Sequence, residues 1–149
     1  MLDETIMELF NRDLNKLKIE ISSYNNESKL WQIEKNIKNS GGNLCLHLIG
    51  NLKQFIGNVL GNNSYIRNRD AEFSLKNVSK SDLVKEIDET IFIVESTIKS
   101  LNAGDFTKIY PVEVFGKPMT TEFFLISLIA HLNYHLGQIN YHRRLIDSI

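Results

Sequence analysis

The sequence predicts an all-α protein in which four helices close into a four-helix bundle. Three observations lead to this fold class. Only two prolines occur in the chain, Pro111 and Pro118, so helix-breaking residues are confined to one short neighbourhood. Apolar residues recur at helical spacing in four separate segments, and each segment has a more polar opposite face. Four such helices can bury their apolar faces against one another.

Composition and charge narrow the classes of protein to which the chain can belong. A length of 149 residues has room for a single domain, spanning residues 1–149. Lys and Arg number 17 against 18 for Asp and Glu, so the chain has no surplus of positive charge for nucleic acid or an anionic membrane. The single cysteine cannot form an intramolecular disulfide, and the acidic N-terminus is unlike a signal peptide. No apolar stretch approaches the roughly 20 residues of a membrane span, so we expect a cytoplasmic protein.

The first two predicted helices are separated by polar and glycine-containing segments. Apolar residues recur at spacings of three to five over residues 2–21, which predicts an amphipathic helix. A turn is predicted at residues 40–43, with Asn43 as the candidate N-cap. The second helix is predicted over residues 44–60, and Gly61 marks its end. Its apolar positions step by four, four, three and four: Leu44, Leu48, Leu52, Phe55 and Val59.

A long polar stretch, residues 61–77, separates the second helix from the third. Its length is unusual for a loop in a compact domain and points to a functional role. Ser79 or Ser81 can cap the third helix, and Gly104 is predicted to end it. This helix has the strongest periodicity in the chain, with apolar positions at Val84, Ile87, Ile91, Val94, Ile98 and Leu101.

Both prolines fall between the third helix and the last. Residues 110–114 alternate in polarity and are consistent with a short strand or hairpin. Thr120 can cap the last helix, and Glu122 lies in its first turn, where the helix dipole favours an acid. The apolar stripe of this helix comprises Phe124, Leu125, Leu128, Leu132, Leu136 and Ile139.

The placement of the four histidines is the most informative feature of the sequence. His131 and His135 are four residues apart, so they lie one turn apart on the same face of the last predicted helix. Because that face overlaps the apolar stripe, both rings are expected at or near the bundle interior. Two imidazoles at this spacing can bind one metal ion. The alternative is a pair of unrelated core or surface histidines.

His47, in the second predicted helix, can supply a third imidazole if the two helices are neighbours. Three histidines with open coordination positions are typical of a reactive site, because a structural zinc ion is closed by four protein ligands. Neutral imidazoles suit Zn, Ni, Cu and Fe(II). Each ring also needs a hydrogen-bond partner for its other nitrogen. The nearest polar groups of a suitable kind are Asn51, Tyr134 and Gln138.

Two other residues are expected to lie outside such a site. His142 is seven residues beyond His135, or about 10 Å further along the helix axis, which is too far to share the ion. With two arginines beside it, His142 is expected to be a solvated helix-end or subunit-contact residue. Cys45 lies about 200° round the helix from His47, so we expect a buried structural thiol. The motifs of zinc proteases, ferritin-like di-iron sites and nucleotide-binding loops are absent from the sequence.

Two segments of the sequence resemble the DinB-like (DinB/YfiT) superfamily of small four-helix metalloproteins. The first runs from Asn43 to Leu52 and contains His47. The second runs from Ala130 to Ile139, and its His-x-x-x-His-x-Gly-Gln ending is the more specific of the two. The loop from Arg67 to Phe73 is similar to that of an uncharacterised bacterial subgroup.

This resemblance implies an up-down-down-up course of the helices, with a long crossover between the second and third over residues 61–77. It also implies that His47, His131 and His135 bind a divalent metal, Zn or Ni, with Mn and Fe as alternatives. A homodimer is expected on the same basis. Characterised members of the superfamily include transferases and isomerases that use low-molecular-weight thiols.

The expected function is metal-dependent transfer of a small thiol, or hydrolysis, acting on a small-molecule substrate. A divalent ion at an open three-histidine site would deprotonate a coordinating thiol or lower the pKa of bound water to about 7. Arg67 and Arg69 are candidates for binding a carboxylate of cofactor or substrate; the alternative is a solvated loop in which they pair with Asp70 and Glu72. For the whole protein, the alternative is a non-catalytic metal-binding or dimerising bundle.

Overall fold

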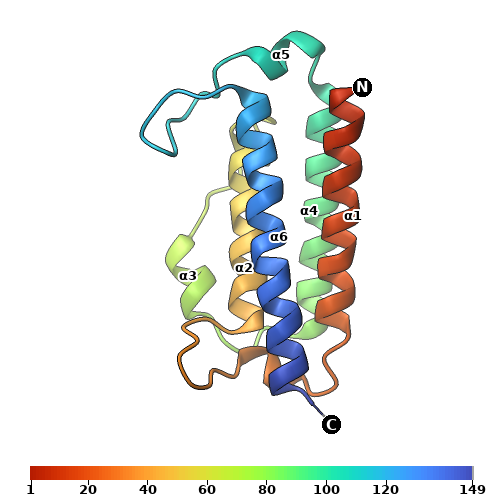
Figure 1. The fold of residues 1–149 in the computed structure, drawn as a ribbon, viewed down its shortest axis with the longest axis vertical. Coiled ribbons are helices and arrows are strands. Elements are labelled where there is room, and N and C mark those ends of the chain that lie inside the picture. Colours follow the sequence, from red (N-terminus) through yellow and green to blue (C-terminus); the bar gives the residue numbers. More distant parts are fainter. Residues whose placement is uncertain (149) are drawn as a thin grey trace.

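Four long helices run side by side in the computed structural model, which describes residues 1–148 (Figure 1). They are α1 (Leu2–Ser22), α2 (Gly41–Leu52), α4 (Lys80–Ser100) and α6 (Thr121–Ile146). Four shorter elements connect them: the 3-10 helix η1 (Glu27–Trp31), the π-helix η2 (Lys53–Asn58), α3 (Arg69–Ser74) and α5 (Ala103–Thr107). No strand occurs among residues 1–148, and the all-α prediction is confirmed.

The four long helices contact one another around a common core. α1 and α2 each pack against both α4 and α6. In Figure 1, α1 and α6 run away from the end that carries the N-terminus, whereas α2 and α4 run toward it. The segment between α2 and α4 therefore returns along the length of the bundle, and α3 packs against α2 within it.

The apolar stripes predicted for the first and last helices are buried over most of their length. On α1 the buried members are Ile6, Phe10, Leu14, Leu17 and Ile21. Every residue of the predicted α6 stripe is buried. On α4, Ile87, Val94 and Ile98 are buried, and Val84 and Ile91 are partly buried against the same core.

Side-chain caps begin the long helices after α1. Ser79 accepts a hydrogen bond from the Asp82 amide, and Thr120 accepts one from the Phe123 amide, so both predicted caps are confirmed. The prediction for α2 was wrong, because Ser40 is the cap and accepts from the Asn43 amide at 3.1 Å. The Asn43 side chain is thereby free to bond elsewhere.

Two helix ends differ from their predictions. α4 ends at Ser100, and Gly104 lies inside α5, whose N-cap is Asn102. α2 continues into η2, and the wider π-helical turn accommodates one residue more than an α-helical turn. The apolar stripe shifts accordingly, so that Ile56 is fully buried while Phe55, the predicted position, is only partly buried.

The proline-containing segment forms a loop instead of a strand. Ile109 and Thr120 make a single isolated antiparallel bridge, and the Tyr110 amide donates to the Met119 carbonyl at 2.8 Å. Tyr110 itself is buried, and its hydroxyl donates to the Phe55 carbonyl. Within residues 1–148, none of the helices has the length and apolar character needed to cross a membrane.

Candidate metal centre

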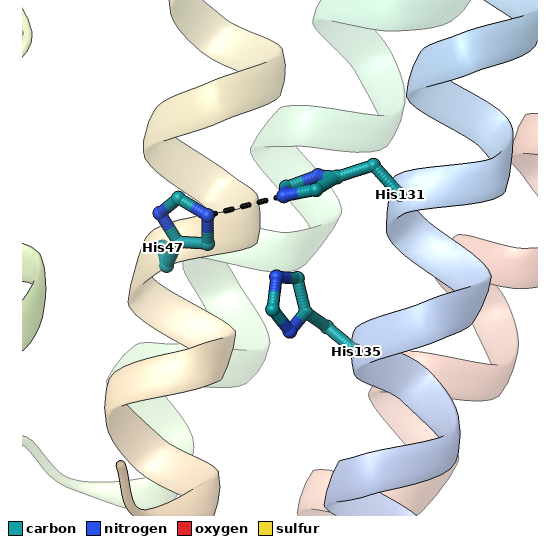
Figure 2. A group of neighbouring side chains, drawn as sticks. All are labelled: His47, His131 and His135. Atoms are coloured by element: carbon teal, nitrogen blue, oxygen red, sulfur yellow. Dashed lines mark hydrogen bonds between the residues drawn. The ribbon is translucent and has the colours of Figure 1, made fainter. Parts of the chain in front are cut away.

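Three of the four histidines converge between α2 and α6 (Figure 2). His47 comes from α2, and His131 and His135 come from successive turns of α6. One ring nitrogen from each lies within 4.8 Å of the others, and Nε2 of His47 is 3.2 Å from Nε2 of His131. His47 is buried, whereas His131 and His135 are partly exposed. The group therefore lies at the edge of the core, with its α6 side toward solvent.

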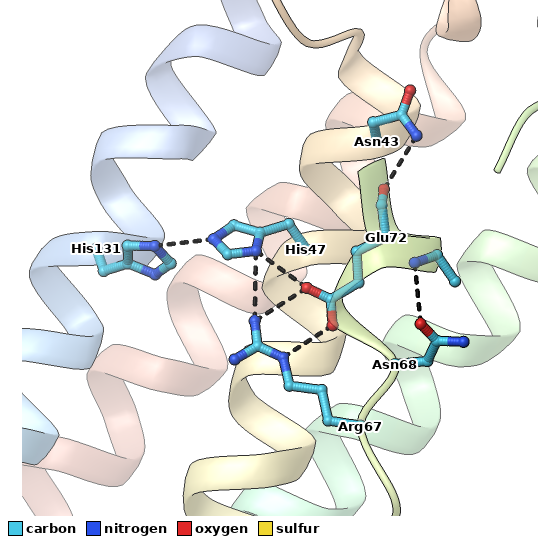
Figure 3. Close-up of polar contacts among 7 residues, drawn as sticks. Asn43, His47, Arg67, Asn68, Glu72 and His131 are labelled. Carbon is cyan, nitrogen blue, oxygen red and sulfur yellow. Dashed lines mark hydrogen bonds and ion pairs between the residues drawn. The ribbon is translucent and has the colours of Figure 1, made fainter. Parts of the chain in front are cut away.

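A carboxylate lies beside His47, at the ring nitrogen that does not face His131 (Figure 3). Oε1 of Glu72, from α3, is 3.1 Å from Nδ1 of His47, and both side chains are almost fully buried. Burial acts to raise the pKa of Glu72, but hydrogen bonds from His47 and Arg67 outweigh it and leave the pKa below its usual value. Glu72 is therefore ionised at neutral pH and can only accept a hydrogen bond.

Arg67 fixes the Glu72 carboxylate with two parallel hydrogen bonds. Its Nε lies 2.9 Å from Oε2 and its Nη2 lies 2.9 Å from Oε1. This bidentate geometry is the strongest form of the arginine–carboxylate pair. Gly50, three residues after His47 on α2, provides the space, because a Cβ at Gly50 would overlap the carboxylate.

The short helix that carries Glu72 is attached to α2 by a side chain. Asn43 donates from Nδ2 to the carbonyls of Glu72 and Leu75, at 3.0 and 2.8 Å. Asn68 caps the other end of α3 by accepting from the Ala71 amide. Both ends of α3 are thus held, and its carboxylate is positioned against His47.

The two α6 histidines are neutral at physiological pH. Burial, together with the charges of His135, His47 and Arg67, lowers the pKa of His131 to about 4. Burial also lowers the pKa of His135, although a hydrogen bond to Gln138 opposes that shift. A neutral imidazole keeps a lone pair on one nitrogen, which is the form that binds a metal.

The predicted partner of His135 is in contact with it. Nδ1 of His135 lies 2.7 Å from Oε1 of Gln138, so Nδ1 donates and Nε2 keeps its lone pair. Tyr134, the second predicted partner, is largely exposed, with its ring centroid 5.3 Å from that of His135. Oδ1 of Asn51, the third, is buried without a hydrogen-bond partner in the protein.

The donor set fits a divalent metal ion. Nε2 of His47 and Nε2 of His131 lie 3.2 Å apart, a separation that zinc–nitrogen bonds of about 2.0–2.1 Å could span. One nitrogen from each of the three rings lies within 4.8 Å of the others, and His131 and His135 are in the neutral form that binds a metal. The three-histidine group can therefore hold a metal ion.

The remaining candidates take different places. Arg67 is engaged by Glu72, as the alternative interpretation of this loop expected, but the pair is buried instead of solvated. The guanidinium of Arg69 lies over the ring of Phe73, 5.2 Å from its centroid. A substrate-binding role for either arginine stays a prediction. Cys45 is fully buried, as predicted, and burial raises its pKa well above the usual value.

His142 is not the solvated residue that the sequence predicted. It is 6% exposed, and both ring nitrogens have partners. Nδ1 lies 2.6 Å from the Tyr24 hydroxyl, and Nε2 lies 2.8 Å from the carbonyl of Gln32. It is a buried structural residue, remote from the metal group along α6.

Glu72 is the residue of the candidate site that the sequence did not reveal. The sequence suggests Glu72 only as a partner for the loop arginines, because it lies 25 residues from His47 along the chain. The available signal was Gly50, whose missing side chain, three residues after His47, leaves room on the face of α2 that receives α3.

The helical fold is similar to that of a DinB-like protein of known structure. A crystal structure of a DinB-like protein from Bacillus cereus superposes with a TM-score of 0.77, at 17% identity, over 98% of this chain and 96% of that one. The structure of a conserved protein from Enterococcus faecalis gives a TM-score of 0.76, at 13% identity, over 96% and 95% of the two chains. These identities establish similarity of fold alone.

The chain belongs to the family described as "Protein of unknown function (DUF1572)", which it matches over residues 4–148. No curated protein matches it. The resemblance to the DinB-like superfamily inferred from the two histidine segments is confirmed at the level of the fold.

Proposed function

We propose that the protein binds a divalent metal ion, zinc or nickel, through His47, His131 and His135, and uses it to activate a small-molecule thiol or water. The observation that carries the proposal is the convergence of three imidazoles from two helices, with one nitrogen of each within 4.8 Å of the others. Three histidines leave coordination positions for other ligands, unlike a closed structural zinc site.

Bound at such a site, the metal would supply a thiolate or hydroxide at neutral pH. The protein's own side chains support this in two ways. Gln138 holds the Nδ1 proton of His135, which directs the lone pair of Nε2 away from Gln138. The partial exposure of His131 and His135 provides a route for a small molecule from the α6 side. Because Cys45 is fully buried, a reacting thiol would come from a small molecule.

Metal content tests the first part of the proposal. Untagged protein is stripped with a chelator, exposed to Zn²⁺ or Ni²⁺, freed of excess metal and analysed for elements. We expect about one ion per chain for the wild type and none for His47→Ala/His135→Ala. The control is His142→Asn, which removes a histidine outside the group and should retain the ion. A wild type with no more metal than the double variant would refute the proposal.

Turnover tests the second part. The zinc- and nickel-loaded proteins are assayed with small thiols paired with electrophiles, and with ester and amide substrates. We expect activity that a chelator removes and added metal restores. A protein that binds the ion and is stabilised by it, but turns over none of these substrates, would be the non-catalytic metal-binding bundle instead.

A further inference from the structure

Glu72 and the metal-facing nitrogens lie on opposite sides of the His47 ring. Nδ1 of His47 is 3.1 Å from Glu72 Oε1, while Nε2 is 3.2 Å from Nε2 of His131 (Figure 3). The carboxylate is therefore directed at the nitrogen of His47 that cannot reach the ion. Its place is that of a hydrogen-bond acceptor for a metal-binding histidine.

The contacts of Glu72 determine which nitrogen of His47 carries the proton. A neutral imidazole has one N–H, and an ionised carboxylate can only accept. Both oxygens of Glu72 already accept from Arg67, which leaves Glu72 no proton to donate to His47. Nη2 of Arg67 also lies 3.4 Å from Nδ1 of His47, but the ionised carboxylate oxygen is the nearer partner, at 3.1 Å, and Nη2 donates to that oxygen at 2.9 Å. We therefore assign the proton to Nδ1, which leaves the lone pair of Nε2 on the side of His131.

The position of the carboxylate is set by the protein around it. Arg67 holds both oxygens, Gly50 leaves space for them, and Asn43 attaches the C-terminal end of α3 to α2. The side chains of Glu72 and His47 are 6% and 8% exposed, so water competes little for this hydrogen bond. The acceptor is thus in place independently of any ion.

We propose that Glu72 is a positioning residue, which holds the proton of His47 on Nδ1 and so presents Nε2 as a metal ligand. Arg67 contributes chiefly by fixing Glu72 with two hydrogen bonds, and its Nη2 lies at a longer 3.4 Å from Nδ1 of His47. This inference rests on the proposed metal-binding function and deepens it. A carboxylate in this position also strengthens the imidazole as a ligand, and loss of such a partner typically weakens metal binding by about 10 to 100-fold.

The first test reads the tautomer of His47 in chelator-stripped wild type. Nitrogen-15 NMR of the histidine rings at pH 8 distinguishes a protonated Nδ1 from a protonated Nε2. We expect His47 to carry its proton on Nδ1. A proton on Nε2 would overturn the inference, and this measurement needs neither a variant nor a metal.

The second test measures Zn²⁺ affinity by competition with a chromophoric chelator. Glu72→Gln keeps the size of the side chain but removes the charge, and we expect the dissociation constant to rise about 10 to 100-fold. The matched control is Glu95→Gln, a partly exposed carboxylate on α4 that pairs with Lys99 and should leave the affinity unchanged. An unchanged affinity in Glu72→Gln, or an equal loss in both variants, would overturn the inference.

A double variant separates the loss of the charged acceptor from the effect of the arginine that Glu72→Gln leaves without its ion-pair partner. Arg67→Met/Glu72→Gln removes that uncompensated charge, and we expect its Zn²⁺ affinity to remain as weak as that of the single variant. Recovery to the wild-type value would mean that the unpaired arginine had repelled the ion, and would overturn the inference. A wild type that binds no Zn²⁺ but carries the His47 proton on Nδ1 would refute the proposed function and leave the role of Glu72 in orienting His47 intact.

Discussion

The Tyr24 hydroxyl and Nδ1 of His142 lie 2.6 Å apart, in a buried contact between the segment after α1 and the end of α6. Nε2 of the same ring faces the carbonyl of Gln32, which can only accept. Nε2 therefore carries the proton, and Nδ1 accepts from Tyr24. A single neutral imidazole thus joins α6 to two parts of the chain between α1 and α2.

Removing the Tyr24 hydroxyl should destabilise the fold. Tyr24→Phe leaves Nδ1 of His142 buried without a donor, which costs about 1 to 3 kcal/mol. Urea unfolding of the metal-free protein measures the change. Tyr141→Phe, at an exposed position of α6, is the control and should be nearly neutral. Equal stabilities for the two variants would contradict the structural role of the hydroxyl.

The buried state of His142 should also make stability depend on pH. Burial lowers its pKa, and this outweighs the hydrogen bond to Gln32 and the charge of Glu34. The unfolded chain, with an ordinary histidine pKa of about 6.5, takes up the proton first as the pH falls. The contribution of His142 to the free energy of unfolding is therefore complete above about pH 6.5 and is lost progressively as the pH falls below it.

Unfolding free energies between pH 7.5 and 5.5, measured in the presence of a chelator, test this dependence. We expect a shallower decline for His142→Asn than for the wild type. Some decline should remain, because His131 and His135 also have pKa values lowered by burial and act in the same direction. Identical slopes for the two proteins would show that His142 does not contribute.

A methyl group at Gly50 should disturb the carboxylate behind His47. The Cβ of Gly50→Ala would overlap Glu72, which Arg67 and His47 hold in place. We expect a net loss of about 1 to 2 kcal/mol, because overpacking exceeds the helix-forming advantage of alanine. Chemical denaturation measures it, and Zn²⁺ affinity should fall as well.

Gly137→Ala is the matched control for Gly50→Ala, since it makes the same change inside α6. A Cβ at Gly137 meets nothing within 4 Å, so the variant should gain roughly 0.5 to 1 kcal/mol. A gain of similar size in Gly50→Ala would mean that the carboxylate moves aside without cost.

Truncation of Gln138 should weaken metal binding less than loss of Glu72. Gln138→Ala removes the acceptor for Nδ1 of His135, but this side chain is exposed and water can replace it. We expect a few-fold rise in the Zn²⁺ dissociation constant, measured by chelator competition. A rise as large as that in Glu72→Gln would contradict the importance of burial.

The local parts of the fold were predictable because they depend on near neighbours along the chain. Helical periodicity identified the buried stripes of α1 and α6, and the caps at Ser79 and Thr120 follow from the residues beside them. The extra residue of η2 was missed, since a π-helical turn leaves an apolar pattern close to an α-helical one. Asn43 has the side chain of a cap, but its bonds go to α3, which the sequence did not reveal.

In the site, too, features set by near neighbours along the chain were predictable and contacts between distant segments were not. His131 and His135 lie on one face because they are one helical turn apart. His47 could be grouped with them only because the two histidine segments resemble those of the DinB-like superfamily. The contact of Glu72 with His47 depends on how the segment between α2 and α4 folds, which no local period encodes. For His142 a local signal existed, because it continues the stripe three residues after Ile139, while the arginines that follow it point to other faces of α6.

The attachment of α3 to α2 has a thermodynamic consequence for the segment that carries it. If α3 separates from α2, His47 loses the acceptor on Glu72, and the open form would hold the ion less tightly. A ligand that prefers the closed form stabilises it by the same factor. Metal binding would then slow hydrogen exchange of the α3 amides, although α3 supplies no ligand. Hydrogen exchange of the α3 amides would then show whether the metal site is occupied, because metal binding and the packing of α3 on α2 favour each other.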